Sequence, residues 1–328
     1  MEGLTAPGYE GVADAMATCG PGVAVAAIVD GQVVVDATTE GLTPRTLVHT
    51  WSAIKPVTGA CVLALVDRGR LDLDQPVASV WPELGDDRLL VRHVLTHCAG
   101  RIACPDADLT DWSATTSALA AQPPDAAPGE IVCEHAITFG FLAGELVRRV
   151  DGRTLGTFLR EELTGPLGLD VHVGVPTADL HRVADTVGLD DAYWADVCGD
   201  AASLRARSLG PRPDVHTDAW RTSEIPAVNG HATALGLATF HQRLLEGRLP
   251  PLVDRPGVTA HDHFVGEEVT WSLAGGQIGG DDIGMGGLGG QWAAARPADA
   301  LAWAFLTSHV GDFERAQRVE DALLAALG

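Results

Sequence analysis

The stretch WSAIKPVTGACVLALVD, residues 51–67, contains the chain's only lysine, Lys55. Pro56 suits the first turn of a helix, and the apolar run after it predicts a helix over about residues 52–67 that ends before Gly69. Ser52 and Lys55 are three residues apart, so at the start of a helix their side chains lie on one face. The hydroxyl and the amine can therefore meet.

This pair of side chains has the chemistry of a nucleophile and its base. A serine hydroxyl is a weak nucleophile at its ordinary pKa and needs a base to become reactive. The positive end of a helix disfavours an ammonium and favours an oxyanion, which suits a lysine acting as that base. The alternative is an ordinary surface lysine at a helix start. Ser52 and Lys55 are therefore candidate catalytic residues.

Outward from this helix, strand patterns lie near both ends of the chain and helix patterns fill the middle. Apolar runs at 22–29 and 32–36 flank Asp30-Gly31, which is the strongest short-range signal of a β-hairpin. Two further strands are expected at 292–295 and 301–306. Helices are expected over residues 9–18, 88–97, 139–150, 155–163, 232–245 and 313–326. Residues 170–228 have the least regular pattern.

This layout predicts an α+β fold, in which an antiparallel sheet built from both termini is flanked by helices. We expect residues 1–70 and 225–328 to form the sheet domain. Residues 71–224 are expected to form an inserted, mainly helical domain, and the two parts to share one active-site cleft.

Composition excludes several classes of function. The 328 residues include 44 acidic and 22 basic ones, a net charge of −22, which argues against nucleic-acid binding and against an anionic membrane surface. No apolar run is long enough for a membrane helix, and no signal peptide is readable. The six cysteines form no CxxC pair, which favours reduced thiols and a cytoplasmic location.

Several motifs in order give the chain a family resemblance. It resembles the serine β-lactamase/penicillin-binding-protein superfamily, and most closely the class C β-lactamase-like esterases. The segments that carry the resemblance are residues 52–83, 91–100, 128–129, 139–169, 229–234 and 284–290. Most of the chain is covered, with residues 170–225 the weakest part.

The resemblance implies an acyl-enzyme mechanism with Ser52 as nucleophile and Lys55 as its base. The backbone amide of Ser52 then forms half of an oxyanion hole. The family's third motif, often Lys-Thr-Gly or His-x-Gly on an edge strand, falls on Met285-Gly286-Gly287. Leu288, which follows it, supplies the second oxyanion amide. Trp51, beside the nucleophile, is a candidate lining residue of the cleft.

Two departures from the family pattern set this chain apart. The family's second motif carries a tyrosine about six residues after a Pro-Gly pair, where it assists proton transfer. In this chain the place is taken by Glu134, followed by His135. Met285 replaces the usual cation or histidine of the third motif, which removes an anchor for a substrate carboxylate.

Glu134 is expected to change the role of the lysine. A carboxylate within reach of Lys55 should hold it as an ammonium and raise its pKa, which makes it a poorer base. Either Glu134 or His135 then becomes the base, or deacylation is impaired. The alternative is that Glu134 is a solvated loop carboxylate.

Other patterns carry weaker alternatives. Residues 284–289 fit GxGxxG, but no strand–helix unit of a dinucleotide site surrounds them, so we reject that interpretation. His93, His97, Cys98 and Cys104 have a spacing that zinc could use, although helix packing or a capped turn explains the histidines as well. Residues 261–263, His-Asp-His, are expected to form a polar loop. We expect no metal and no cofactor.

The sequence therefore predicts a serine hydrolase or acyltransferase that forms an acyl-enzyme on Ser52. Its expected partner is a small-molecule acyl substrate, an ester, thioester or amide of a metabolite or natural product, and β-lactam hydrolysis is expected to be weak or absent. The alternative is a repurposed member of the family that binds a ligand or performs non-acyl acid–base chemistry at Glu134 and His135.

Overall fold

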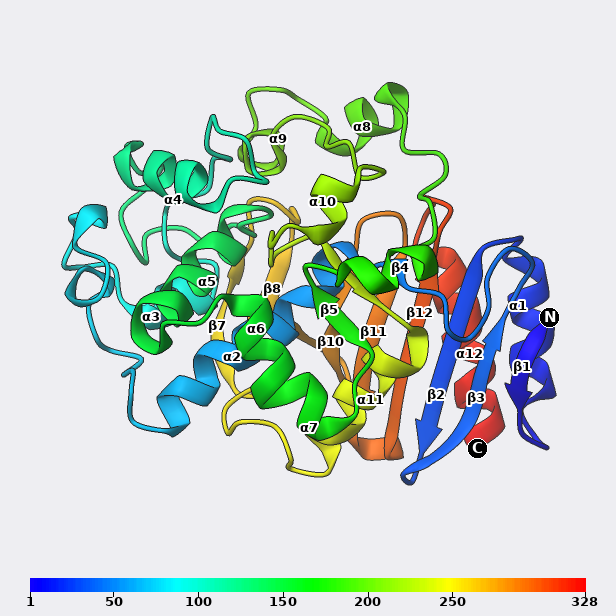
Figure 1. Cartoon of the computed structure of the whole chain (residues 1–328). Helices are drawn as coiled ribbons and strands as arrows, with labels where there is room; N and C mark the ends of the chain where they lie inside the picture. Colours follow the sequence, from blue (N-terminus) through cyan, green and yellow to red (C-terminus); the bar gives the residue numbers. More distant parts are fainter.

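A nine-stranded antiparallel sheet forms the centre of the computed structural model, which describes residues 1–328 (Figure 1). The strand order is β1-β3-β2-β12-β11-β10-β9-β8-β7. The strands are β1 (Glu2–Thr5), β2 (Val23–Val29), β3 (Gln32–Thr38), β7 (Pro256–His261), β8 (Glu268–Ser272), β9 (Gln277–Gly279), β10 (Asp282–Gly287), β11 (Gln291–Arg296) and β12 (Leu301–Thr307). The pairing of β2 with β12 joins the two ends of the chain, which confirms the predicted α+β fold.

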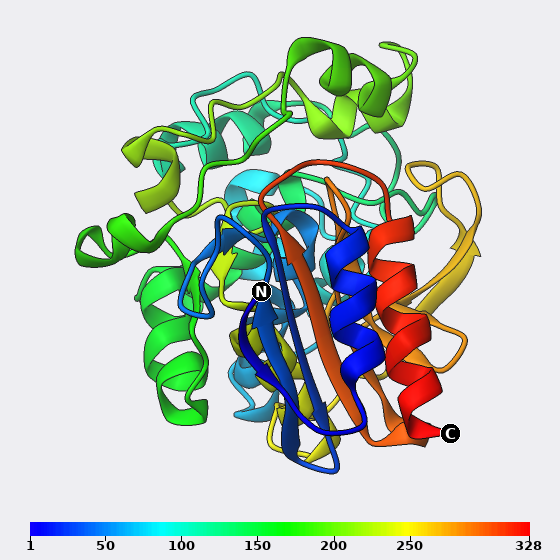
Figure 2. The ribbon, with the colours of Figure 1, turned by 90° about the vertical axis from the view of Figure 1, so that its right-hand side faces the viewer.

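Helices cover both faces of this sheet. On one face, α1 (Glu10–Thr18) and α12 (Glu314–Leu327) lie side by side (Figure 2). On the other, α11 (Ala234–Leu245) packs on β2, β11 and β12, and α2 (Lys55–Asp67) packs against β10. Because side chains alternate along a strand, Val25 of β2 joins the α1–α12 core while Ala26 joins the α2–α11 core. The near-continuous apolar sequence of β2 follows from this double burial.

The middle of the chain is mainly helical and lies to the left and top of Figure 1. Its helices are α3 (Val91–Leu95), α4 (Trp112–Ala121), α5 (Thr138–Asp151), α6 (Leu155–Leu159), α7 (Gly165–Leu167), α8 (Asp191–Cys198), α9 (Leu204–Leu209) and α10 (Asp218–Thr222). A small three-stranded sheet, in the order β4 (Val48–His49), β6 (Gly230–Ala232) and β5 (Val171–Val173), links this helical part to the large sheet. The predicted domain boundaries at 70–71 and 224–225 stay a prediction.

Short helical turns complete the list of elements. They are η1 (Trp51–Ile54), η2 (Val77–Ser79), η3 (Pro82–Leu84), the π-helical η4 (Arg160–Thr164), η5 (Thr177–Arg182) and η6 (Pro297–Asp299). The most important is η1, because it carries the candidate nucleophile directly into α2.

The predicted hairpin is confirmed, with Asp30 and Gly31 at φ 47° and 76°, as a type I′ turn requires. The helix expected over 88–97 is shorter, ending at Leu95, because His97 adopts a left-handed φ of 59°. In the large sheet, β1, β7, β8 and β9 were not predicted. β1 and β7 are the two edge strands, β8 and β9 lie next to β7, and none of the four has a long apolar run.

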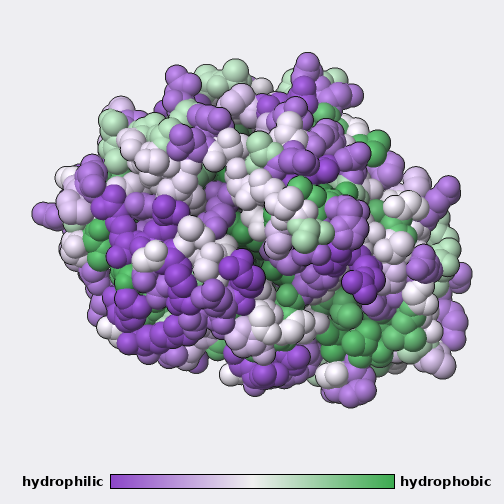
Figure 3. Space-filling view, in the orientation of Figure 1, coloured by the Kyte–Doolittle hydropathy of each residue, from purple (hydrophilic) through white to green (hydrophobic).

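The face of the molecule seen in Figure 3 carries both polar and apolar residues. In Figure 3 apolar residues gather over β2 and β3, while polar residues dominate the face over the helical part. None of the helices combines the length and the apolar character needed to cross a membrane.

Candidate active site

Ser52 lies in the turn η1, immediately before α2. Trp51, the residue before it, has a left-handed φ of 50°, which is a strained conformation for a large non-glycine residue and is typical of functional sites. Strands β6 and β10 pack closely against this turn at two glycine residues. A Cβ atom on Gly230 would lie 2.5 Å from Thr50 Oγ1, and one on Gly287 would lie 2.4 Å from the Thr50 carbonyl oxygen. Close packing therefore holds the Ser52 turn between two strands.

Lys55 is fully buried and reaches three acceptors. Its Nζ lies 2.6 Å from Ser52 Oγ, 2.9 Å from Glu134 Oε1 and 3.2 Å from the Ala227 carbonyl oxygen. An ammonium has three N–H donors and no acceptor, so this geometry suits the charged form.

The pKa of Lys55 is lowered, whereas the sequence predicted that it would be raised. Glu134 raises it as expected, but burial lowers it by more, so the pKa lies below its ordinary value. The sequence identified the carboxylate and could not show that the lysine is completely removed from water.

Glu134 is the third member of the site and is only 5% exposed, so it is not a solvated loop carboxylate. Its Oε1 accepts the Ser52 hydroxyl proton at an oxygen–oxygen distance of 3.1 Å. Lys55 donates to the same serine oxygen. The Ser52 hydroxyl proton thus points to the carboxylate. The Lys55 amine donates a hydrogen bond to the serine oxygen that becomes the nucleophile.

The segment that carries Glu134 is fixed on two sides. The His97 carbonyl oxygen accepts the Cys133 amide at 3.2 Å, and His97 Nδ1 accepts the His135 amide at 3.1 Å. On the other side, Ser208 Oγ donates to the Glu134 carbonyl oxygen at 2.9 Å and accepts the Ala136 amide at 2.7 Å. These bonds hold the carboxylate in place.

Sequence reasoning missed the positioning roles of His97 and Ser208. His97 was considered as a possible zinc ligand or as part of helix packing or a capped turn, and Ser208 lies in the least regular stretch. Their contacts join residues 38 and 72 positions apart, which local spacing does not report.

His135 lies next to Glu134 but is directed elsewhere. Its Nδ1 contacts the Cys133 carbonyl oxygen at 2.7 Å, and no hydrogen bond joins its imidazole to Ser52, Lys55 or Glu134. Burial lowers its pKa to about 4, so the ring is neutral near pH 7. Of the two alternative bases, the geometry favours Glu134.

The third-motif residues lie on β10, beside the Ser52 turn. Leu288 directly follows the strand, and neither its amide nor that of Ser52 donates among the hydrogen bonds of the turns and loops. Both residues line the same cavity, so their two amides are the candidates to hold a substrate oxygen. Met285 is buried in a small apolar cluster with Val132 and Trp271. Its thioether is therefore surrounded by apolar side chains.

A cavity of about 800 Å³ opens in front of Ser52 and Glu134. It is bordered by Met285 to Gly289, by aromatic residues and by a largely acidic rim. Arg205 is its only cationic lining residue, whereas the lining carboxylates are Glu134, Asp196, Glu267, Glu268 and Asp312. This charge distribution favours neutral or cationic ligands over anionic ones.

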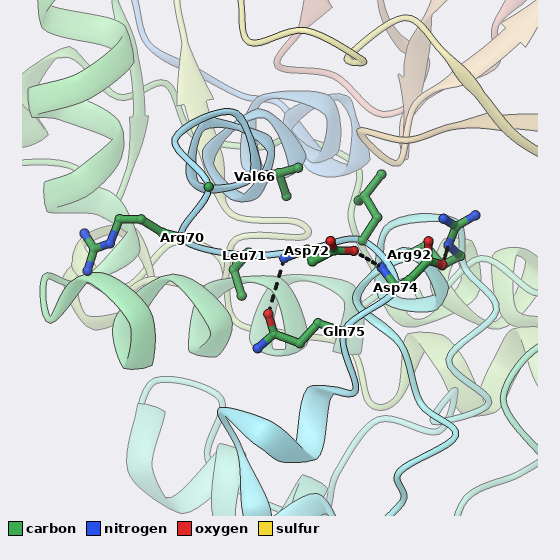
Figure 4. A pocket seen from close by; sticks show the side chains of 9 residues that line it. Val66, Arg70, Leu71, Asp72, Asp74, Gln75 and Arg92 are labelled. Carbon is green, nitrogen blue, oxygen red and sulfur yellow. Dashed lines mark hydrogen bonds and ion pairs between the residues drawn. The ribbon is translucent and has the colours of Figure 1, made fainter.

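A separate cavity of about 470 Å³ lies at the end of α2 (Figure 4). Its polar groups pair with one another: Arg92 and Asp74 form an ion pair with Nε and Oδ1 2.6 Å apart, and Asp72 Oδ1 accepts the Asp74 amide at 2.8 Å. Gln75 Oε1 accepts the Asp72 amide at 3.3 Å. It contains no nucleophile and is not the candidate active site.

The histidine and cysteine patterns do not converge on a metal site. No group of three His, Cys, Asp or Glu side chains has the geometry to hold a metal ion. His93 instead accepts the Leu90 amide at 3.2 Å, which caps the start of α3.

The chain is similar to known proteins along most of its length. The Beta-lactamase family model matches residues 12–327. The chain is 35% identical over 256 residues to the esterase/beta-lactamase LipL of Mycobacterium tuberculosis, an alignment that covers 69% of this chain and 59% of that protein. This chain thus spans less than two thirds of its curated relative.

Solved structures show the same fold over nearly the full length. A penicillin-binding protein homologue from Caulobacter crescentus is 30% identical with a TM-score of 0.86, and the match covers 99% of both chains. A family VIII carboxylesterase is 26% identical with a TM-score of 0.83, again over 99% of both chains.

Proposed function

Because the chain belongs to the β-lactamase family, we propose that it is a serine hydrolase of the esterase type that forms an acyl-enzyme on Ser52. The observation that carries the proposal is the triangle of Ser52, Lys55 and Glu134, whose sides measure 2.6, 2.9 and 3.1 Å. The proposed substrates are esters, thioesters or amides of small metabolites or natural products.

Acylation begins when the substrate carbonyl oxygen accepts the amides of Ser52 and Leu288. Glu134 takes the hydroxyl proton as Ser52 Oγ forms a bond to the carbonyl carbon, and Lys55 stabilises the developing negative charge. When the tetrahedral intermediate collapses, the bond to the leaving group breaks. Glu134 returns the proton to that group, which departs as a neutral alcohol, thiol or amine.

Deacylation reverses these roles. A water molecule takes the place of the leaving group, and Glu134 removes its proton as the oxygen attacks the acyl carbon. The bond to Ser52 then breaks, and the serine recovers its proton from Glu134. A second alcohol or amine in the large cavity would make the same chemistry an acyl transfer.

Two relatives support the proposed esterase activity, and the cysteines support the proposed location. LipL is described as an esterase/beta-lactamase, and the neighbour at 26% identity as a carboxylesterase. All six cysteines are free thiols, which is consistent with the reducing cytoplasm that we propose as the location.

Turnover of p-nitrophenyl acetate by the purified chain tests the proposal. We expect release of p-nitrophenolate by the native chain and none above background by Ser52→Ala. Equal rates for the two folded proteins would reject the acyl-enzyme on Ser52.

A further inference from the structure

Two cavities of very different size meet at Ser52, and we propose that the narrow one receives the acyl chain while the large one receives the leaving group. The narrow pocket is lined by Trp51, Trp194, Trp220, Ile137 and Val228, among others. This assignment rests on the proposed acyl-enzyme and defines the class of ester that the site accepts.

Both cavities touch the reacting centre. Ser52 and Leu288 line the large cavity and the narrow pocket alike. A carbonyl carbon attacked by Ser52, with its oxygen on the two amides, therefore has one substituent directed to each side. The large cavity offers about 800 Å³, whereas only about 20 Å³ of the narrow pocket admits a water-sized sphere.

The position of Glu134 decides which substituent goes where. Its carboxylate lines the large cavity and not the narrow pocket. The leaving oxygen or nitrogen must receive a proton from Glu134 when its bond to the acyl carbon breaks, so it has to lie within hydrogen-bond reach of that carboxylate. The leaving group therefore occupies the large cavity, and the acyl chain extends into the narrow pocket.

The walls of the narrow pocket indicate a short, apolar acyl chain. Most of its lining is aromatic or aliphatic. Three tryptophans, Trp51, Trp194 and Trp220, form part of this lining, and the space of about 20 Å³ is little more than one water molecule needs. A short acyl chain can enter it, while a long one would have to displace the tryptophans.

Two isomeric esters test the assignment directly. Hexyl acetate and ethyl hexanoate have the same formula and differ only in which side of the ester carries the long chain. With rates divided by the hydroxide-catalysed rates, we expect kcat/KM in a pH-stat assay to favour hexyl acetate at least about tenfold, since one misplaced methylene can cost that factor. Equal values, or a preference for ethyl hexanoate, would overturn the assignment.

Variants of the pocket wall sharpen the test. Trp220→Phe and Val228→Ala enlarge the narrow pocket and should raise the ethyl hexanoate to hexyl acetate ratio at least about threefold. Val62→Ala removes the same atoms as Val228→Ala from a buried site that lines neither cavity, and its ratio should stay at the native value. An unchanged ratio in both folded pocket variants would contradict the proposal.

An error in the proposed function and an error in the assignment of the cavities give different results. If the native chain hydrolyses neither isomer nor p-nitrophenyl acetate, the proposed function itself is wrong. If it hydrolyses p-nitrophenyl acetate but shows no preference between the isomers, only the assignment of the cavities is wrong.

Discussion

Glu134 Oε1 lies 3.1 Å from Ser52 Oγ, although the two residues are 82 positions apart in the chain. The same carboxylate oxygen lies 2.9 Å from Lys55 Nζ. The buried Lys55 amine is thus paired with Glu134, and the carboxylate oxygen lies where it can accept the Ser52 proton.

Replacing Glu134 by Gln should lower kcat/KM for p-nitrophenyl acetate by about 10²–10⁴-fold, because an amide keeps the size of the side chain and cannot accept the proton. Glu134→Asp should retain more activity than Glu134→Gln. Steady-state rates on variants with native circular dichroism spectra provide the measurement. Native-like rates for Glu134→Gln would exclude the carboxylate as base.

Removing the cation should destabilise the fold. Lys55→Met leaves Glu134 buried without its counter-charge, which costs about 3–5 kcal/mol in the free energy of unfolding. Adding Glu134→Gln to that variant should recover much of the loss. Urea unfolding of the two single variants and the double variant gives the coupling, and purely additive effects would show that the pair does not interact.

Acid should lower the free energy of unfolding, because several histidines are buried. Burial lowers the pKa of His135 to about 4 and those of His231 and His241 to about 3. In the unfolded chain these groups bind protons near pH 6.5, so below that pH the unfolded state holds more protons than the folded one. The stabilisation is complete above about pH 6.5 and is lost as the pH falls toward 4, by up to about 1.4 kcal/mol per pH unit for each histidine.

Unfolding midpoints in urea between pH 7.5 and 5 measure this slope. His241→Leu, which removes one titrating group of similar volume outside the catalytic triangle, should flatten the dependence. An identical slope in the native chain and in that variant would show that His241 does not contribute.

Anionic substrates should be poor ones. The carboxylate of a chromogenic cephalosporin enters a cavity that is lined by Met285, five carboxylates and one guanidinium. We expect its kcat/KM to lie at least about 100-fold below that of p-nitrophenyl acetate and to rise with ionic strength as the repulsion is screened. Comparable values at low salt would contradict this account of the charge in the cavity.

His97 should act on catalysis through the position of Glu134. His97→Leu removes the acceptor for the His135 amide, and a misplacement of about 1 Å can cost about 100-fold in rate. His97→Asn keeps an acceptor and tolerates the left-handed backbone, so it should recover part of kcat. If both variants lose stability while kcat and KM stay native, the role of His97 is structural only.

Local patterns predicted the elements whose signals are local. Asp30-Gly31 fixed the hairpin, and the spacing of Ser52 and Lys55 placed the hydroxyl and the amine together. By contrast, three of the six residues of β10 are glycines, which have low strand propensity, so only the family resemblance indicated a strand there.

The rest of the site depends on distant contacts. The sequence proposed that Glu134 replaces the family's tyrosine, and the structure brings its carboxylate to Ser52 and Lys55. The complete burial of Lys55, which sets the direction of its pKa shift, depends on packing that no spacing encodes. Trp194 and Trp220 lie in the least regular stretch of the sequence and still form a wall beside Ser52.

The most direct test is the intact mass of the native chain after treatment with an alkyl fluorophosphonate. Ser52 Oγ should displace fluoride from phosphorus, which adds one phosphonyl group per chain, and peptide mapping should place it on Ser52. Ser52→Ala should remain unlabelled under the same conditions. A folded native chain that gains no mass, or that is labelled equally in the Ser52→Ala variant, would contradict the nucleophilic role of Ser52.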